Sequence, residues 1–217
     1  KLYIKVRFLI IKRGKMDLDK FFKAKSVAIV GVSKDPKKVG HVIFRNLLDA
    51  NFRGNLYLVN PNAYEILNRH AYKSLNEIKD EVELAVIAVP AKKVLDVVKD
   101  CGKKNIKNVV IITSGFKEIG NSKLEGQLKD LINKFKINMI GVNCLGVFDA
   151  STKLDTLFLP RYRLRRPSPG GISFVSQSGA IGSAILDLAT TENYGIAKFV
   201  SYGNATTIDE ADILEYL

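Results

Sequence analysis

Residues 26–31 are Ser-Val-Ala-Ile-Val-Gly, and this stretch decides the fold because its pattern recurs along most of the chain. An almost uninterrupted apolar run that ends at a glycine is typical of a strand buried on both faces of a sheet. Strands that alternate with helices pair in parallel through right-handed crossovers. The sequence therefore predicts a doubly wound α/β domain over residues 16–145. Its further strands are predicted at 55–59, 84–89, 108–112 and 138–141, and its helices at 39–50, 91–103 and 124–135.

A second α/β pattern begins after a polar stretch at 146–171, which contains three prolines and a Gly-Gly pair and is predicted to be a linker. Two strand–helix units cannot build a covered sheet, so we expect residues 172–217 to be the first part of a second domain that continues further. Residues 1–15 are basic and apolar and are predicted to be an N-terminal extension. The second domain should contain strands at 172–175 and 197–201 and helices at 180–190 and 209–217.

The 217 residues include 34 Lys and Arg and 22 Asp and Glu, a net charge of 34 − 22 = +12. A composition of 47% hydrophobic and 26% charged residues excludes a disordered or collagen-like chain. Nine of the twelve net charges lie in two segments, because residues 1–20 contribute +5 and four linker arginines contribute +4. No aromatic-studded basic face accompanies them, which argues against nucleic-acid binding and favours a partner chain or a phosphorylated ligand. The four arginines are Arg161, Arg163, Arg165 and Arg166.

The two cysteines, Cys101 and Cys144, are too few for a disulfide framework and indicate reduced thiols in the cytoplasm. No run approaches the ~18 apolar residues of a membrane span, and no cleavage site follows the short apolar stretch near the N-terminus. We therefore expect no membrane partner and no signal peptide. No spacing of cysteines or histidines matches a metal site, so no metal ligand is predicted in this chain.

The loop from Gly31 to Gly40 follows the first predicted strand and has the features of a phosphate site. A glycine allows a sharp turn, and the N-terminus of the next helix presents unpaired N–H groups to an anion. Ser33 adds a hydroxyl, and Lys34, Lys37 and Lys38 add positive charge. An ordinary solvated turn is the alternative interpretation.

A nicotinamide-dependent oxidoreductase is disfavoured by the same loop. In the pattern Gly-x-Gly-x-x-Gly, Ser33 stands in place of the second glycine and Pro36 in place of the third. The second strand ends at Asn60, where a ribose-binding enzyme has an acidic residue. The Walker A pattern is also missing, whereas a phosphorylated adenosine ligand remains compatible.

A second anion site is predicted at Ser176-Gln177-Ser178-Gly179, which directly precedes the helix beginning at Ala180. Free N–H groups and the helix dipole would attract a phosphate there. The alternative is a simple serine cap of that helix.

Six motifs occur in an order that resembles the α-subunit of ADP-forming acetyl-CoA (acyl-CoA) synthetase, in the succinyl-CoA synthetase superfamily. The resemblance implies a Rossmann-like CoA-binding domain followed by the start of a flavodoxin-like second domain. The motifs are Gly31-Val32-Ser33, Val59-Asn60-Pro61, Ala88-Val89-Pro90-Ala91, Thr113-Ser114-Gly115-Phe116-Lys117-Glu118, Gly141-Val142-Asn143-Cys144-Leu145-Gly146 and Ser176-Gln177-Ser178-Gly179-Ala180.

The resemblance also implies where CoA lies. Its phosphates would lie on the first loop, its adenosine beyond the second strand, its pantetheine along the third and fourth strand ends and its thiol at the fifth. Two positions depart from the family, because Asn62 replaces a frequent lysine and Val142 replaces a proline. In that order along the ligand, the implied residues are Gly31, Val32, Ser33, Lys34, Asp35 and Lys38, then Asn60, Pro61 and Asn62, then Val89, Pro90, Thr113 and Ser114, and finally Asn143 and Cys144.

The family reaction would convert acyl-CoA, ADP and phosphate into a carboxylate, CoA and ATP through an acyl phosphate and a phosphohistidine. The chain has only His41 and His70, and neither lies in a matching motif, so the phosphohistidine is expected beyond Leu217. Cys144 has no neighbouring base in sequence and is expected to be a small residue beside the thioester rather than a nucleophile.

The resemblance implies a hetero-oligomer in which a β-subunit or a fused ATP-grasp domain holds ADP or ATP with Mg²⁺. The 176–179 loop would face the phosphohistidine. A CoA-binding or CoA-sensing module without catalysis is the alternative, because no phosphohistidine lies within these residues.

Overall fold

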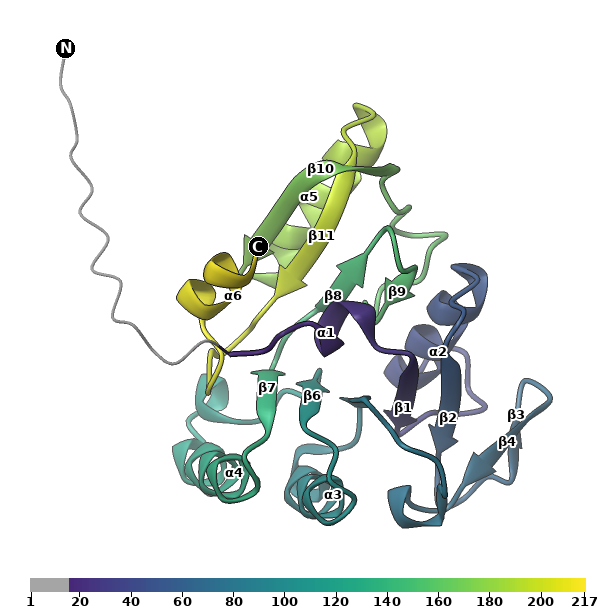
Figure 1. Ribbon diagram of the computed structural model, residues 1–217, viewed down its shortest axis with the longest axis vertical. Coiled ribbons are helices and arrows are strands. Elements are labelled where there is room, and N and C mark those ends of the chain that lie inside the picture. The colour runs from purple at the N-terminus through teal and green to yellow at the C-terminus, as the bar shows by residue number, and fades with distance from the viewer. Residues whose placement is uncertain (1–15) are drawn as a thin grey trace, which may run out of the picture.

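The computed structural model describes residues 16–217, so the predicted extension over residues 1–15 lies outside the described part. Residues 26–141 contain the strands of a sheet whose order is β3-β4-β2-β1-β5-β6-β7 (Figure 1). All neighbouring pairs are parallel except β3 and β4. This confirms the predicted doubly wound α/β fold. The strands are β1 (Ser26–Val30), β2 (Asn55–Val59), β3 (Glu65–Ile66), β4 (Arg69–Tyr72), β5 (Leu84–Ile87), β6 (Asn108–Ile111) and β7 (Asn138–Gly141).

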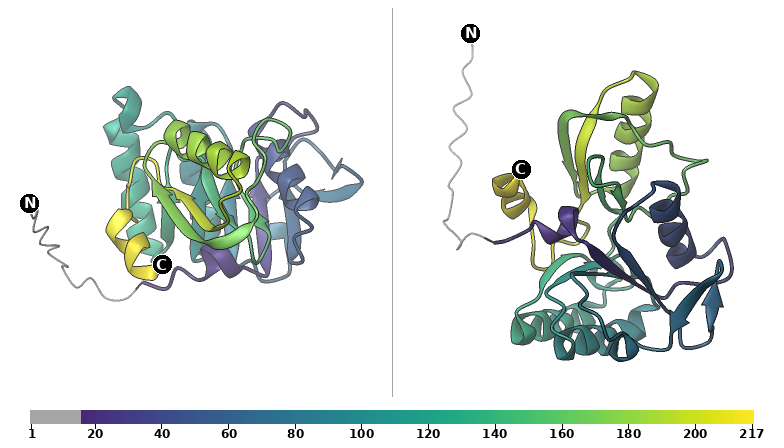
Figure 2. Two further views of the ribbon diagram at one scale, coloured as in Figure 1. Left: turned by 90° about the horizontal axis from the view of Figure 1, so that it is seen from above. Right: turned by 45° about the vertical axis from the view of Figure 1, so that its right-hand side comes forward.

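Strand β1 is buried along its whole length because helices cover both faces of the sheet. Val27 and Ile29 pack on the side of α2 (Val39–Asp49), and Ala28 and Val30 pack on the side of the other two helices. The alternation follows from the two-residue period of a strand. Figure 2 shows the other two helices side by side on their face; they are α3 (Ala91–Lys103) and α4 (Ser122–Phe135).

Residues from 146 onward form a second sheet with the order β10-β11-β8-β9. Strands β10 and β11 are parallel, as predicted, while β8 and β9 join them in antiparallel pairs. Helix α5 (Gly179–Thr191) packs on β10 and β11, and α6 (Glu210–Tyr216) follows. The strands are β8 (Gly146–Asp149), β9 (Leu154–Asp155), β10 (Pro169–Ser176) and β11 (Ile196–Ser201).

Strands β8 and β9 lie inside the stretch predicted as a linker, and their acidic residues explain the difference. Asp149 and Asp155 are buried, although aspartate in sequence indicates a turn or loop. Each has a basic partner, because Lys198 Nζ lies 3.3 Å from Asp149 Oδ2 and Arg166 Nε lies 2.9 Å from Asp155 Oδ2. Lys198 is distant in sequence from Asp149, and Arg166 lies 11 residues after Asp155, so neither pairing is visible in a local hydrophobic pattern.

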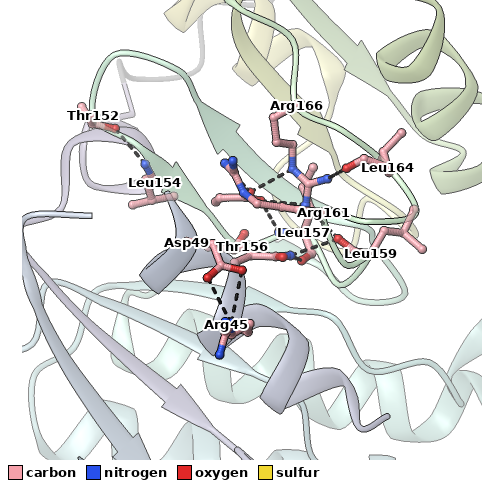
Figure 3. Close-up of polar contacts among 12 residues, drawn as sticks. Arg45, Asp49, Thr152, Leu154, Thr156, Leu157, Leu159, Arg161, Leu164 and Arg166 are labelled. Carbon is pink, nitrogen blue, oxygen red and sulfur yellow. Dashed lines mark hydrogen bonds and ion pairs between the residues drawn. The ribbon is translucent and has the colours of Figure 1, made fainter. Parts of the chain in front are cut away.

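The four linker arginines were expected to meet a partner or a ligand, but two of them are used internally. Arg161 and Arg166 both contact the carboxylate of Asp155. Figure 3 shows Arg166 turned toward the backbone carbonyls of Leu159 and Leu164. Of the four, only Arg163 and Arg165 are exposed.

The β3–β4 hairpin was also not anticipated. His70, which was expected in a polar connection, lies on β4 between two tyrosine rings. The ring centroids of Tyr64 and Tyr72 lie 4.9 and 4.7 Å from that of His70. The strands of this hairpin have two and four residues, which is too short for an apolar period to be recognised.

The two sheets share one hydrophobic core. Val147, Leu154 and Val200 of the second sheet belong to the same buried cluster as Ile29 and Leu58 of the first. Helix α1 (Lys20–Lys23) contributes Phe21 and Phe22 to it. Within residues 16–217, no helix is long and apolar enough to cross a membrane.

Candidate functional site

Two adjoining cavities lie at the carboxyl ends of the parallel strands, where ligands bind in sheets of this kind. The cavity at the Gly31 turn, which we call the turn cavity, has a volume of about 650 Å³. The second, which we call the junction cavity because both sheets contribute to it, has a volume of about 830 Å³. The two share a wall and so form one groove; the shared residues are Val39, Ala88, Val89 and Pro90.

Two glycines allow the backbone of the turn cavity to close up. Gly31 has a φ of +95°, and a Cβ there would lie 2.4 Å from the carbonyl oxygen of Ala88. A Cβ on Gly40, in the first turn of α2, would lie 2.3 Å from the carbonyl oxygen of Gly31. The helix therefore begins directly against the turn. Within the described residues, Lys38 makes no side-chain cap, so the first N–H groups of α2 remain available beside the cavity.

The buried His41 and the partly buried Asn60 hold this loop by hydrogen bonds to its backbone. His41 Nδ1 donates to the carbonyl oxygen of Ser33 at 2.7 Å, and Asn60 Nδ2 donates to that of Val32 at 2.6 Å. The hydroxyl of Ser33 accepts from the N–H of Asp35 at 3.1 Å. His41 and Asn60 thus hold the turn from outside the loop, whereas the side chain of Ser33 makes its hydrogen bond within the loop.

The basic residues that line the turn cavity differ in part from those predicted. Lys38 lines it, whereas Lys34 and Asp35 are exposed and do not. Lys73 and Lys93 line it as well and were missed. Within residues 16–217, none of these three lining lysines has an ion-pair partner within 4.0 Å. The remaining predicted residues that line the cavity are Gly31, Val32, Ser33, Asn60, Pro61, Asn62, Val89 and Pro90.

One of the missed lysines had a local signal. Lys93 stands in the first turn of the helix after Pro90, the same kind of position that drew attention to the loop before α2. Lys73 follows the unanticipated hairpin, so its place at the cavity depends on tertiary structure alone.

The junction cavity differs in composition, because none of the described residues that line it is charged. Thr113 Oγ1 donates to the carbonyl oxygen of Val89 at 2.7 Å, and the N–H of Asn143 donates to that of Thr113 at 2.9 Å. Three neighbouring strand ends are tied together in this way. The predicted residues that line this cavity are Val89, Pro90, Thr113, Ser114, Asn143, Cys144, Gln177, Ser178 and Gly179.

Cys144 lines this cavity in a form unsuited to nucleophilic attack. Its side chain is nearly inaccessible, and its thiol donates to the carbonyl oxygen of Ile111 with an S···O distance of 3.4 Å. Burial raises the pKa of the Cys144 thiol to about 12. The group therefore remains protonated at neutral pH.

The serines of the 176–179 loop use their hydroxyls within the protein. Ser178 Oγ accepts from the N–H of Ile181 at 3.2 Å, which caps α5. Ser176 Oγ donates to the carbonyl oxygen of Ser178 at 2.9 Å, and Ser176 does not line either cavity. The loop thus faces the junction cavity through Gln177, Ser178 and Gly179.

A polar network that the sequence did not reveal joins the two sheets beside Asn143. Asn204 Nδ2 donates to Glu118 Oε2 at 2.7 Å and to Glu125 Oε2 at 3.0 Å, and its Oδ1 accepts from Asn143 Nδ2 at 3.4 Å. Partial burial opposes ionisation of Glu118, but hydrogen bonds led by the N–H of Gly115 lower the pKa of its carboxyl. Asn204 is therefore fixed between a charged support and the cavity.

Comparison with known proteins matches two parts of the chain to two families. Residues 25–150 match the CoA binding domain family, and residues 169–217 match the succinyl-CoA ligase like flavodoxin domain. An acetate–CoA ligase (ADP-forming) of Methanocaldococcus jannaschii is 45% identical over 88% of this chain. The α-subunit of acetate–CoA ligase (ADP-forming) I of Pyrococcus furiosus is 42% identical over 93% of it.

A solved structure is similar over the same range. It is described as the dinucleotide forming acetyl-coenzyme A synthetase 1 of Ca. Korarchaeum cryptofilum in complex with phosphate and ADP. Its TM-score is 0.88 and its identity 40%, over 92% of this chain. The present chain spans 26% and 44% of the two sequence relatives and 42% of that structure.

Proposed function

This chain belongs to the CoA-binding domain family, and from that premise we propose that it is the N-terminal part of the α-subunit of an ADP-forming acyl-CoA synthetase. The two sequence relatives at 45% and 42% identity are named ligases, which favours the synthetase over a CoA-binding module without catalysis.

The observation that carries the proposal is the division of one groove into a charged end and a neutral end. Lys38, Lys73 and Lys93 line the turn cavity, and uncharged residues line the junction cavity. CoA has the same polarity, with a pyrophosphate and a 3′-phosphate at one end and a thiol at the other. Its phosphates would bind the lysines and the N-terminus of α2. Its pantetheine would pass Val89 and Pro90 toward Asn143 and Cys144.

In the reaction we propose, acyl-CoA, ADP and phosphate yield a carboxylate, CoA and ATP through an acyl phosphate and a phosphohistidine. Neither His41 nor His70 is among the residues that line the two cavities, so the phosphohistidine would come from outside this chain segment. The N-terminus of α5 would stabilise the phosphoryl group through its dipole and N–H groups.

A β-subunit or a fused ATP-grasp domain would hold ADP or ATP with Mg²⁺ in a hetero-oligomer. Within residues 16–217, no group of three or more His, Cys, Asp or Glu side chains could hold a metal ion. The two buried free cysteines support a cytoplasmic location.

Thermal-shift titration of the complete protein with CoA and with NAD⁺ tests the binding step. CoA at 100 times its Kd should raise the stability by about 2.7 kcal/mol, and NAD⁺ should leave it unchanged. The complete protein with its partner should also form ATP from acetyl-CoA, ADP and phosphate. Stabilisation by NAD⁺ and not by CoA would overturn the assignment.

A further inference from the structure

Phe158 is the one aromatic residue among the described residues that line the junction cavity. Its N–H donates to the carbonyl oxygen of Leu145 at 3.3 Å, so it lies beside the residue that follows Cys144. Leu145 in turn lies close to the start of α5, because a Cβ added to Gly179 would lie 3.4 Å from the Cβ of Leu145. Phe158 therefore lies where the predicted thiol end of CoA and the 176–179 loop meet.

The backbone on both sides of Phe158 is held by hydrogen bonds. Asn46 of α2, which is 1% exposed, donates through Nδ2 to the carbonyl oxygens of Leu157 at 2.6 Å and Leu159 at 3.0 Å. Arg166 Nη2 donates to the carbonyl oxygen of Leu159 at 2.8 Å (Figure 3). The residues before and after Phe158 are thus tied to different parts of the molecule.

Arg166 is itself held by a buried ion pair. Its Nε and Nη2 contact the two oxygens of Asp155 at 2.9 and 3.2 Å, and their side chains are 3% and 0% exposed. The carboxylate also accepts from the N–H of Leu157 at 3.3 Å. Breaking a buried pair of this kind leaves an uncompensated charge, which strongly opposes any movement of the segment. Phe158 is therefore a fixed wall of the cavity rather than a mobile lid.

Resting on the function proposed above, we infer that Phe158 determines the length of the acyl group. The acyl chain of a bound thioester would extend from the sulfur beside Cys144 into the space bounded by Phe158, Leu145 and Gln177. The aromatic ring limits how far the chain can extend. Because no charged side chain lines this space within the described residues, the far end of the acyl group would be uncharged.

The test measures kcat/KM of the complete protein with its partner for acetyl-CoA, butyryl-CoA and hexanoyl-CoA. Phe158→Ala should raise the hexanoyl-to-acetyl ratio about tenfold or more, since each methylene accommodated in an apolar pocket is worth about 10-fold or more. Phe158→Trp should lower the ratio. Phe174→Ala is the matched control, because Phe174 packs against the same hydrophobic cluster and lines neither cavity. Its ratio should equal that of the wild type.

The outcomes separate the inference from the proposed function. A wild type that uses acyl-CoA, with an unchanged ratio in Phe158→Ala, overturns the role of Phe158 and leaves the proposed function intact. A wild type inactive on every thioester overturns the proposed function and this inference with it. Phe158→Leu keeps the apolar packing and replaces the alanine variant where that variant does not fold, and its ratio should move in the same direction.

Discussion

The turn cavity and the junction cavity adjoin, yet they differ in the charge of their lining residues and in the contacts that hold their walls. The turn cavity is lined by residues of one sheet and its helices. Three exposed lysines supply its positive charge, and Asp100 is the acidic residue among the described residues that line it. The junction cavity takes residues from both sheets, has no charged lining residue among those described and depends on buried ion pairs and hydrogen bonds behind its wall. Under the proposed placement of CoA, exposed lysines would bind its charged end, and a wall held by buried contacts would border its reacting end.

The largest effect should come from removing the buried charge behind the junction cavity. Asp155→Ala leaves Arg166 buried without its partner, so the free energy of unfolding should fall by about 3–5 kcal/mol in a denaturant titration. Arg45→Ala, which removes the exposed Arg45–Asp49 pair on α2, is the control and should cost under about 0.5 kcal/mol. Equal losses in the two variants would contradict the view that the wall rests on a buried pair.

A smaller loss should follow from filling the space behind the turn cavity. Gly40→Ala places a Cβ 2.3 Å from the carbonyl oxygen of Gly31, so stability should fall by about 1–3 kcal/mol and CoA should bind more weakly. Gly126→Ala is the matched control, because a Cβ there has no described atom within 4 Å. Gly126 also lies inside a helix, so its replacement should stabilise the protein by up to about 1 kcal/mol. Denaturant titration and calorimetry measure both effects, and CoA affinity unchanged in Gly40→Ala would sink the placement of the phosphates.

Charge removal at the turn cavity should alter binding and leave folding almost unchanged. Lys38→Ala and Lys93→Ala should each weaken CoA about tenfold, and raised salt should reduce the difference from the wild type. Lys37→Ala is the control, since Lys37 is exposed on the same loop and lines neither cavity. If Lys37→Ala weakens CoA as much as Lys38→Ala does, the effect is one of net charge and not of this cavity.

The smallest effect should be a pH dependence at the junction. The pKa of Glu118 is lowered on folding, so its contribution is present above the usual value of 4.5 and disappears as the pH falls through the folded value. Solvent screens this partly exposed group, so the contribution should stay under about 1 kcal/mol. Denaturant titrations of the wild type and Glu118→Gln at pH 7 and pH 4 measure it, and the variant should lose less stability on acidification. Parallel losses would contradict an ionised Glu118 as the support of Asn204.

Much of the first sheet could be predicted from sequence because its signals are local. The apolar runs from Ser26 and Asn55 and the proline after β5 each mark a strand or its end within a few residues, and the structure contains those strands. Gly31 and Ser33 could be placed at a cavity for the same reason, since a strand end and a helix start are adjacent in the chain.

The junction could not be predicted in the same way because its parts come from distant positions. Asn46 lies 113 residues before Leu159, and Asn204 lies 86 residues after Glu118. An aspartate such as Asp155 predicts a loop, and only its ion pair with Arg166 explains why it is buried in a strand. Phe158 follows Asp155 in a short stretch without helical or strand-like hydrophobic periodicity. The local sequence therefore does not distinguish a residue that lines a cavity from one that fills the core.

The hydrophobic core shared by the two sheets has a practical consequence for anyone preparing fragments of this protein. Cutting the chain at residue 145 would remove Val147, Leu154 and Val200 from the cluster that contains Ile29 and Leu58. The remaining fragment would then expose apolar surface. Such surface promotes self-association. A fragment prepared for crystallography or ligand screening should therefore include the second sheet, because the second sheet covers apolar surface of the first.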